Sequence, residues 1–328
     1  MLEDAYRWLC DHGATSSDKI VLAGFSEGAH AARVLVLMIT DLGLVNQRYM
    51  ELVDMMFEHW VGWREQENDA QANEGVRRLR AQFEHVLTYP LRVDTCAVFD
   101  TNATLGASSS YELTPSSNTK LRFGRKRIGT IRKVCHAMAL DEDHTVFPVD
   151  LWEDQELWSL VRSRMRQCWF RGSHIDIGGD SNTVVSTIAL MWMFVLLQGD
   201  PDLGLLFDTA KMIHIIQNNT VTANVGDLRR WKFESHGQRQ RRPGRLSTER
   251  AHISARLLQE RNLVETLKNS SGPWLKNNRW YWGFSIGGST MLWEFDRAEY
   301  ANIHGRDNGS VALEQYYLRM MGLMSTVD

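Results

Sequence analysis

The sequence has few cysteines and little net charge, and neither quantity favours a specialised class of protein. Its four cysteines are scattered without a Cys-x-x-Cys pair, so we expect neither a disulfide framework nor a thiolate metal site. A net charge of −3 gives no overall attraction to nucleic acid. The acidic start, Met1-Leu2-Glu3-Asp4, lacks the apolar core of a signal peptide. We therefore expect a cytoplasmic protein that uses no metal or other cofactor.

The sequence also lacks a hydrophobic run long enough to cross a membrane. The most apolar window, residues 187–197, is too short to span a bilayer and predicts a buried helix. With 328 residues, 43% of them hydrophobic, the chain can bury a large core. Its twelve tryptophans are therefore expected mainly in that core, although a lipid-facing surface is the alternative.

One short motif predicts chemistry. An apolar run of strand length leads into Gly24-x-Ser26-x-Gly28, and a helix-forming run, residues 29–39, follows at once. Strand, sharp turn and helix are the setting of a nucleophile elbow, in which the serine hydroxyl is exposed beside the helix N-terminus. We expect glycine at both flanking positions because side chains there would collide as the two backbones approach. An ordinary strand–helix turn is the alternative.

Strand and helix patterns alternate along the chain, which predicts an α/β fold. We expect a mostly parallel sheet with helices on both faces, as in α/β-hydrolases. A catalytic domain would span residues 1–268, with a helical insertion (48–88) over the carboxyl edge of the sheet. An aromatic-rich extension (269–328) would pack on it as strands or loops. The expected strands are 19–23, 91–99, 132–140 and 167–170; the expected helices are 2–10, 29–39, two within 48–85, 183–198, 204–216 and 250–267; residues 103–127 are expected as a loop.

Three candidate catalytic residues each follow a predicted strand, in the chain order Ser26, Asp100, His174. Because catalytic groups collect at the carboxyl ends of parallel strands, this order predicts the triad of an α/β-hydrolase. A serine needs a base to take its proton, and His174 is the first candidate, ahead of His252, which begins a late helix. Asp100 and Asp176 compete to orient the imidazole, but Asp176 lies so close to His174 that shaping the loop suits it better.

The remaining charged groups receive simpler interpretations. The backbone N–H of Glu27 is expected to stabilise the oxyanion. Three adjacent acids, Asp141-Glu142-Asp143, cannot all face one ion, so they are expected to be solvated or to brace their loop. The arginine-rich run at residues 239–245 is expected to be an exposed loop, with contact to anionic lipid headgroups as the alternative. A nucleic-acid role is not expected, because the rest of the chain is not basic.

Five ordered motifs carry a resemblance across about three-quarters of the chain. They are Gly24-Phe25-Ser26-Glu27-Gly28-Ala29 with Ala32-Arg33, Phe99-Asp100-Thr101 with Gly106, His136-Ala137-x-Ala139-Leu140-Asp141-Glu142 with Phe147-Pro148, Trp169-Phe170-x-Gly172-x-His174-x-Asp176-Ile177-Gly178-Gly179, and Arg242-Pro243-Gly244 with His252-x-Ser254-x-Arg256. Together they resemble the catalytic domain of type VI secretion phospholipase effectors, an α/β-hydrolase family. The resemblance implies hydrolysis of carboxylic esters, with phospholipids as substrates, by a triad of Ser26, Asp100 and His174.

The sequence also departs from the family pattern. Glu27 stands where arginine is usual, Asn102 where valine is usual, His144 where an arginine commonly follows, and Asp180-Ser181 where the glycine run normally ends. The family's opening strand, with its Asp-Gly-Thr motif, has no counterpart before the elbow. We therefore expect an incomplete sheet with an edge prone to self-association, and weak activity for want of the second oxyanion donor. A catalytically degenerate homologue that binds without hydrolysing is the alternative function.

Overall fold

The structure is a computed structural model, and it divides the chain into two compact units. The first unit comprises Met1–Val134 and Asp150–Trp158, and the second comprises Cys135–Val149 and Ser159–Asp328. The structure describes residues 2–66, 68–102, 131–142, 148–152, 165–179, 183–219, 241, 249–260, 270–276, 279–284, 290–293 and 315–323.

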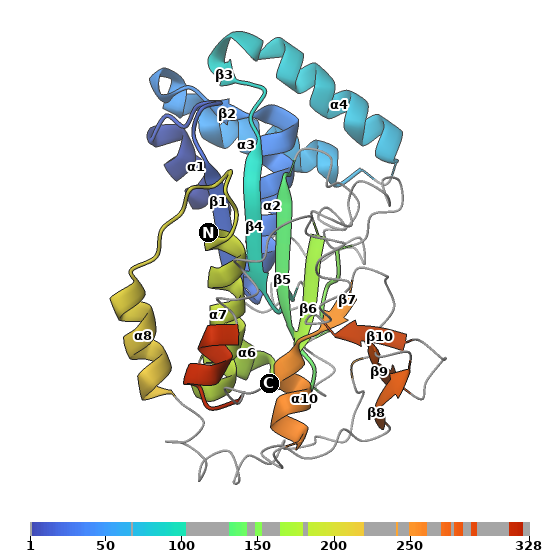
Figure 1. Ribbon diagram of the computed structural model, residues 1–328. Coiled ribbons are helices and arrows are strands. Elements are labelled where there is room, and N and C mark those ends of the chain that lie inside the picture. Colours follow the sequence, from blue (N-terminus) through green and yellow to red (C-terminus); the bar gives the residue numbers. More distant parts are fainter. Residues whose placement is uncertain are drawn as a thin grey trace. The chain divides into compact units, whose positions relative to one another are not determined.

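Two parallel strands form the centre of the first unit (Figure 1). Strand β1 (Ile20–Phe25) pairs with β4 (Val93–Phe99), and the last register pair joins Phe25 to Phe99. Helix α1 (Leu2–Asp11) precedes β1, and α2 (Glu27–Leu42) follows it. Both helices were predicted, and α1 differs from its predicted range (2–10) by one residue at its end. Helix α2 extends beyond its predicted range (29–39) at both ends. The side chains of Tyr6, Met38, Ile39 and Leu42 are fully buried.

The helical insertion contains the two long helices that the sequence predicts. They are α3 (Val53–Arg64) and α4 (Asp69–Gln82), with short 3₁₀ helices on either side. A small antiparallel pair, β2 (Leu44–Val45) and β3 (Leu87–Thr88), closes the ends of the insertion. The 3₁₀ segments are η1 (Gln47–Leu52) and η2 (Glu84–Val86).

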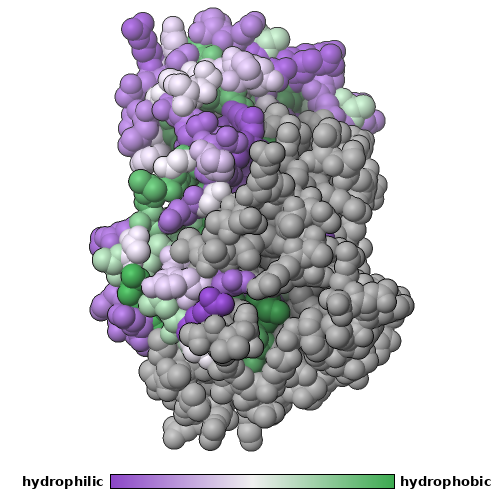
Figure 2. Space-filling model, in the orientation of Figure 1, coloured by the Kyte–Doolittle hydropathy of each residue, from purple (hydrophilic) through white to green (hydrophobic). Residues whose placement is uncertain are grey.

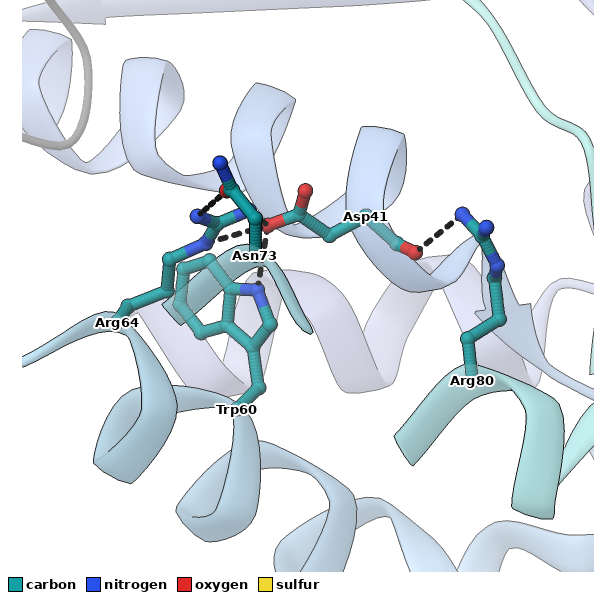
Figure 3. A network of polar contacts seen from close by, with 5 residues as sticks. All are labelled: Asp41, Trp60, Arg64, Asn73 and Arg80. Carbon is teal, nitrogen blue, oxygen red and sulfur yellow. Dashed lines mark hydrogen bonds and ion pairs between the residues drawn. The ribbon is translucent and has the colours of Figure 1, made fainter. Parts of the chain in front are cut away.

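A buried polar network joins this insertion to α2 (Figure 3). The carboxylate Oδ2 of Asp41 accepts hydrogen bonds from Trp60 Nε1 (2.9 Å) and from Arg64 Nε (2.8 Å) and Nη2 (2.5 Å). Arg64 Nη1 also donates to Asn73 Oδ1 on α4 (2.8 Å), and Arg80 Nη1 donates to the Asp41 carbonyl (3.2 Å). Asp41 and Arg64 are both buried, so the carboxylate and the guanidinium compensate each other's desolvation.

The insertion lies at the opposite end of α2 from Ser26, which corrects the sequence prediction. Asp41 is fifteen residues beyond Ser26, a distance of roughly 22 Å along a helix. The insertion leads through β3 to the start of β4, and Figure 1 shows α3 and α4 beside β2 and β3 at that end. The helices therefore cover the amino edge of the strands rather than the carboxyl edge. Their described surface in Figure 2 is mostly hydrophilic.

The second unit is built on a sheet of its own strands. In the strand order it runs β5, β6, β7, β10, β9, β8. The pairs β6–β7 and β7–β10 are parallel, whereas β9 is antiparallel to both of its neighbours. The bounds are β5 (Lys133–Ala139, begun in the first unit), β6 (Met165–Phe170), β7 (Glu249–Ala251), β8 (Ser270–Lys276), β9 (Arg279–Phe284) and β10 (Thr290–Trp293).

The described part of the second unit contains helices whose bounds agree only in part with the predicted ones. They are α6 (His174–Gly178), α7 (Thr183–Gln198), α8 (Thr209–Asn218) and α10 (Ile253–Glu260). Only α7 has the predicted bounds. Helix α8 starts late because Asp208 caps it, its side chain accepting from Lys211 N. No helix in the described part of the chain is both long and apolar enough to cross a membrane.

The α/β fold with a mostly parallel sheet and surrounding helices is confirmed. Two local predictions are wrong. Residues 249–251 form a strand where a helix from residue 250 was predicted, since three residues carry too short a pattern to separate strand from helix. The segment after β6, predicted as a loop, begins the short helix α6 at His174. The predicted loop 103–127 lies outside the described residues.

Candidate active site

Ser26 occupies the turn between β1 and α2 in a strained conformation. Its φ of 56° and ψ of −119° lie outside the regions that side-chain-bearing residues ordinarily adopt. Such strain persists only where the surrounding structure enforces it, and it is typical of a nucleophile elbow. Ser26 precedes α2 directly, yet its side chain makes no capping hydrogen bond to the helix. It is also partly exposed.

The glycines of the motif have different roles. A Cβ atom on Gly24 would lie 2.4 Å from the carbonyl oxygen of Gly28, a contact that backbone atoms cannot accommodate. A Cβ on Gly28 would meet no atom within 4 Å. The expected collision therefore applies at Gly24 alone, because only Gly24 faces the crossing backbone of the helix.

The end of β4 is tied to the elbow by two backbone hydrogen bonds. Ser26 N donates to Phe99 O (3.1 Å), and Asn102 N donates to Ser26 O (3.3 Å). Asp100 lies between these two attachment points, with a φ of 41° and a fully buried side chain. The structure thus brings Ser26 and Asp100 to the same end of adjacent strands. Asn102 shares in this attachment through its backbone, which a valine at this position could also provide.

The N-terminus of α2 begins immediately after Ser26. Glu27 is its first residue, and the first N–H groups of a helix have no partner within the helix. Free N–H groups and the helix dipole both favour negative charge beside this end of the helix. The Glu27 side chain is itself favourable at this end of a helix. The oxyanion role of its backbone N–H remains a prediction.

His174 lies in the second unit, at the start of α6 and four residues beyond β6. It is 4% exposed, and its backbone N donates to Glu142 Oε2 (2.9 Å). The neighbouring Asp176 carboxylate accepts from both N and Oγ of Ser173 (2.7 Å each). Asp176 therefore shapes the turn that presents His174, as its spacing suggests. Ser26 and Asp100 belong to the first unit, so the partnership of His174 with them remains a prediction.

The acidic run after β5 braces the same turn. Asp141 accepts from Arg171 Nε (2.8 Å) and from Gly172 N (2.7 Å) through its Oδ2. Burial raises the pKa of the Asp141 carboxyl above its ordinary value, while the Arg171 guanidinium opposes that rise. With Glu142 bonded to His174 N, two of the three acids hold the segment that follows β6. Asp143 and His144 lie outside the described residues.

Arg171 is a residue that the sequence analysis missed. It follows β6 directly, is 1% exposed and forms a buried ion pair with Asp141. The available signal was weak: an arginine and an aspartate, each placed just after an apolar strand. Their pairing depends on β5 and β6 being neighbours, which Leu140 N donating to Phe170 O (2.8 Å) illustrates.

His252 follows β7, and its ring contacts Ser254 and Phe170. Its Nδ1 accepts from Ser254 N (3.2 Å) and lies 2.7 Å from Ser254 Oγ, while its ring stacks on Phe170 with centroids 4.6 Å apart. An amide N–H can only donate, so Nδ1 is the acceptor of the bond from Ser254 N. A base requires an unprotonated nitrogen facing the substrate. These contacts favour a structural role at the start of α10.

The arginine-rich segment is described at one position only. Arg241 is half-buried, and its Nη1 donates to the carbonyl of Ala139 at the end of β5 (2.9 Å). The rest of the segment lies outside the described residues, as do Asp180 and Ser181. All four cysteines are buried thiols. Among the described residues, no group of three His, Cys, Asp or Glu side chains could hold a metal ion.

Comparison with known families agrees with this arrangement. The sequence model described as "T6SS, Phospholipase effector Tle1-like, catalytic domain" matches residues 1–195. The match covers more than half of the chain and includes Ser26, Asp100 and His174. The chain belongs to this family. No curated protein and no solved structure matches it.

Proposed function

We propose that this chain is a serine hydrolase that cleaves a carboxylic ester of a lipid, with phospholipids as the substrate class. Membership of a family of phospholipase effector catalytic domains supports a lipase-type hydrolase in general. The strained backbone of Ser26 at a strand–helix turn is the single observation that carries the serine-dependent chemistry.

In the proposed first step, Ser26 Oγ attacks the ester carbonyl carbon while His174 takes the hydroxyl proton. The carbonyl oxygen becomes an oxyanion, which the backbone N–H of Glu27 stabilises. Collapse of this intermediate breaks the ester C–O bond. The departing alcohol takes the proton from His174, and the acyl group stays on Ser26.

In the second step, His174 takes a proton from water, and the resulting hydroxide attacks the acyl-Ser26 carbonyl. Collapse returns the proton to Ser26 Oγ and releases a carboxylic acid. Asp100 holds the imidazole in one tautomer and stabilises its cationic form. Burial of Asp100 supports this role, because an ionised carboxylate so deeply placed requires a polar partner.

A fluorophosphonate probe tests the proposal, because it modifies only an activated serine. We expect the wild-type chain to be labelled at Ser26, and to release acid from short-chain esters and phospholipid vesicles. Ser26→Ala should abolish both signals while leaving Tm nearly unchanged, since a partly exposed elbow side chain contributes little packing. If wild type and Ser26→Ala behave alike, Ser26 is not the nucleophile. A wild-type chain that binds vesicles but is never labelled would support the degenerate homologue instead.

A further inference from the structure

Arg33 is a buried arginine on α2, two turns beyond Ser26, which precedes the helix. Only 1% of its surface is exposed. Its Nη1 donates to the Asp150 carbonyl (2.5 Å), and its Nη2 donates to the Leu151 carbonyl (3.2 Å). The guanidinium carbon lies 4.2 Å from the centre of the Trp152 ring. One side chain therefore fixes three consecutive residues against α2.

The segment that Arg33 holds is also bonded to the strand end that carries Asp100. Asp150 N donates to Thr101 O (3.0 Å), one residue beyond Asp100. The next residue, Asn102, donates its backbone N to Ser26 O (3.3 Å). These bonds close a circuit within the first unit, from Ser26 along α2 to Arg33, across to Asp150, and back through Thr101 and Asn102.

Apart from the partly exposed Ser26, the residues at and around this circuit are almost entirely shielded from water. Asp100, Thr101, Asn102 and Trp152 have no exposed surface, and Asp150 is 6% exposed. Placing a guanidinium among them is costly unless its donors are satisfied. An apolar side chain would fill such a space more cheaply. The planar fork of arginine can bond two carbonyls and stack on an indole at once, which a lysine cannot do.

We propose that Arg33 is a positioning residue that fixes the Asp100 strand end relative to Ser26. This inference rests on the proposed function for its catalytic consequence. Arg33 touches neither substrate nor reacting atoms; it acts through residues 150–152 and 101–102. Loss of the fork would let the strand end shift, and a displacement near 1 Å at a catalytic group costs about a hundredfold in rate.

The chain offers a matched control in Arg64. It too is a buried arginine bonded to α2, but at Asp41, roughly 22 Å from Ser26 along the helix. A substitution there perturbs the same helix and the same unit without touching the circuit. If a substitution of Arg33 lowers activity only through lost stability, a substitution of Arg64 with the same loss of stability should lower activity equally.

The experiment compares wild type, Arg33→Lys, Arg33→Met and Arg64→Lys on a soluble short-chain ester. We expect Arg33→Lys to lower kcat about tenfold and Arg33→Met about a hundredfold, with KM within about twofold. The rate of labelling of Ser26 by the fluorophosphonate should fall by the same factors. At a loss of Tm equal to that of Arg33→Lys, Arg64→Lys should keep kcat within about twofold of the wild-type value. Equal effects of Arg33→Lys and Arg64→Lys on kcat would overturn the inference.

Hydrogen exchange separates failure of this inference from failure of the proposed function. The backbone amides of Ser26 and Asn102 close the circuit, so their exchange should accelerate in Arg33→Lys and stay at the wild-type rate in Arg64→Lys. An unlabelled and inactive wild type would refute the proposed function, but accelerated exchange would still establish the positioning by Arg33. Unchanged exchange at both amides in Arg33→Lys would refute that positioning whatever the activity.

Discussion

Ser26 and Asp100 stand in equivalent places on two adjacent parallel strands. Each directly follows one member of the last register pair, Phe25 and Phe99, and each has a positive φ, 56° and 41°. Backbone hydrogen bonds on either side of Asp100 attach its strand end to Ser26. Backbone strain of this kind persists only where the surrounding structure enforces it, so the two strand ends hold both residues in these conformations.

The first prediction concerns the acid of the triad. Asp100→Asn should lower kcat by about four orders of magnitude, because an amide would favour the wrong imidazole tautomer. Asp176→Asn should lower kcat by no more than about tenfold, since Asp176 bonds Ser173 and shapes the turn. Steady-state kinetics on a soluble ester measures both. A larger loss in Asp176→Asn than in Asp100→Asn would reverse the assignment.

The second prediction concerns the base. His174→Ala should abolish turnover and the labelling of Ser26, because a serine hydroxyl needs a base to take its proton and His174 is the proposed base. His252→Asn should retain activity within about threefold and lower stability by about 1 kcal/mol, as expected for a weakened contact at a helix start. Asparagine can still accept from Ser254 N at that position. Full activity in His174→Ala would leave His252 as the candidate base.

The fold was predictable wherever a local pattern was long. Apolar runs predicted β1, β4, β5 and β6, and the 16-residue apolar segment predicted α7 without error. Strand β7 was not predictable, because its three residues Glu249–Ala251 are a strand only through pairing with neighbours on both sides. Contacts distant in sequence decide such elements.

The candidate site was predictable to a different extent. The strand–helix turn is encoded locally by Gly24 and Ser26, so the sequence predicts the turn that the structure shows. The role of Ser26 as nucleophile stays a prediction. The roles of Arg33 and Arg171 depend on carbonyls and carboxylates more than 29 residues away in the sequence. The position of the insertion was missed for a similar reason: the pattern predicts α3 and α4, but the contact with Asp41 decides at which end of α2 they lie.

The third prediction concerns the cysteines. All four thiols are buried, and burial raises the pKa of Cys10 to about 11. At pH 8 only about one Cys10 thiol in a thousand would be the reactive thiolate. We expect an aromatic disulfide reagent to modify none of the four in the native chain at pH 8, and all four in denaturant. Rapid modification of the native chain would show that one of these sites is accessible.

The last prediction separates the two glycines of the elbow. Gly24→Ala should destabilise the first unit by about 3 kcal/mol or more, because the new Cβ would lie 2.4 Å from the Gly28 carbonyl oxygen and neither backbone can yield without opening the turn. The same shift would move Ser26, so labelling by a fluorophosphonate should fall at least about a hundredfold in the fraction that stays folded.

Gly28→Ala is the matched control: it adds the same methyl group to the same turn, where no atom lies within 4 Å. It should keep the wild-type labelling rate and raise the free energy of unfolding by up to about 1 kcal/mol, since alanine favours a helix more than glycine does. Denaturant unfolding and labelling kinetics on the two variants provide the comparison. A tolerated alanine at position 24, or a disruptive one at position 28, would mean that the strand and the helix do not cross as closely as the structure has them.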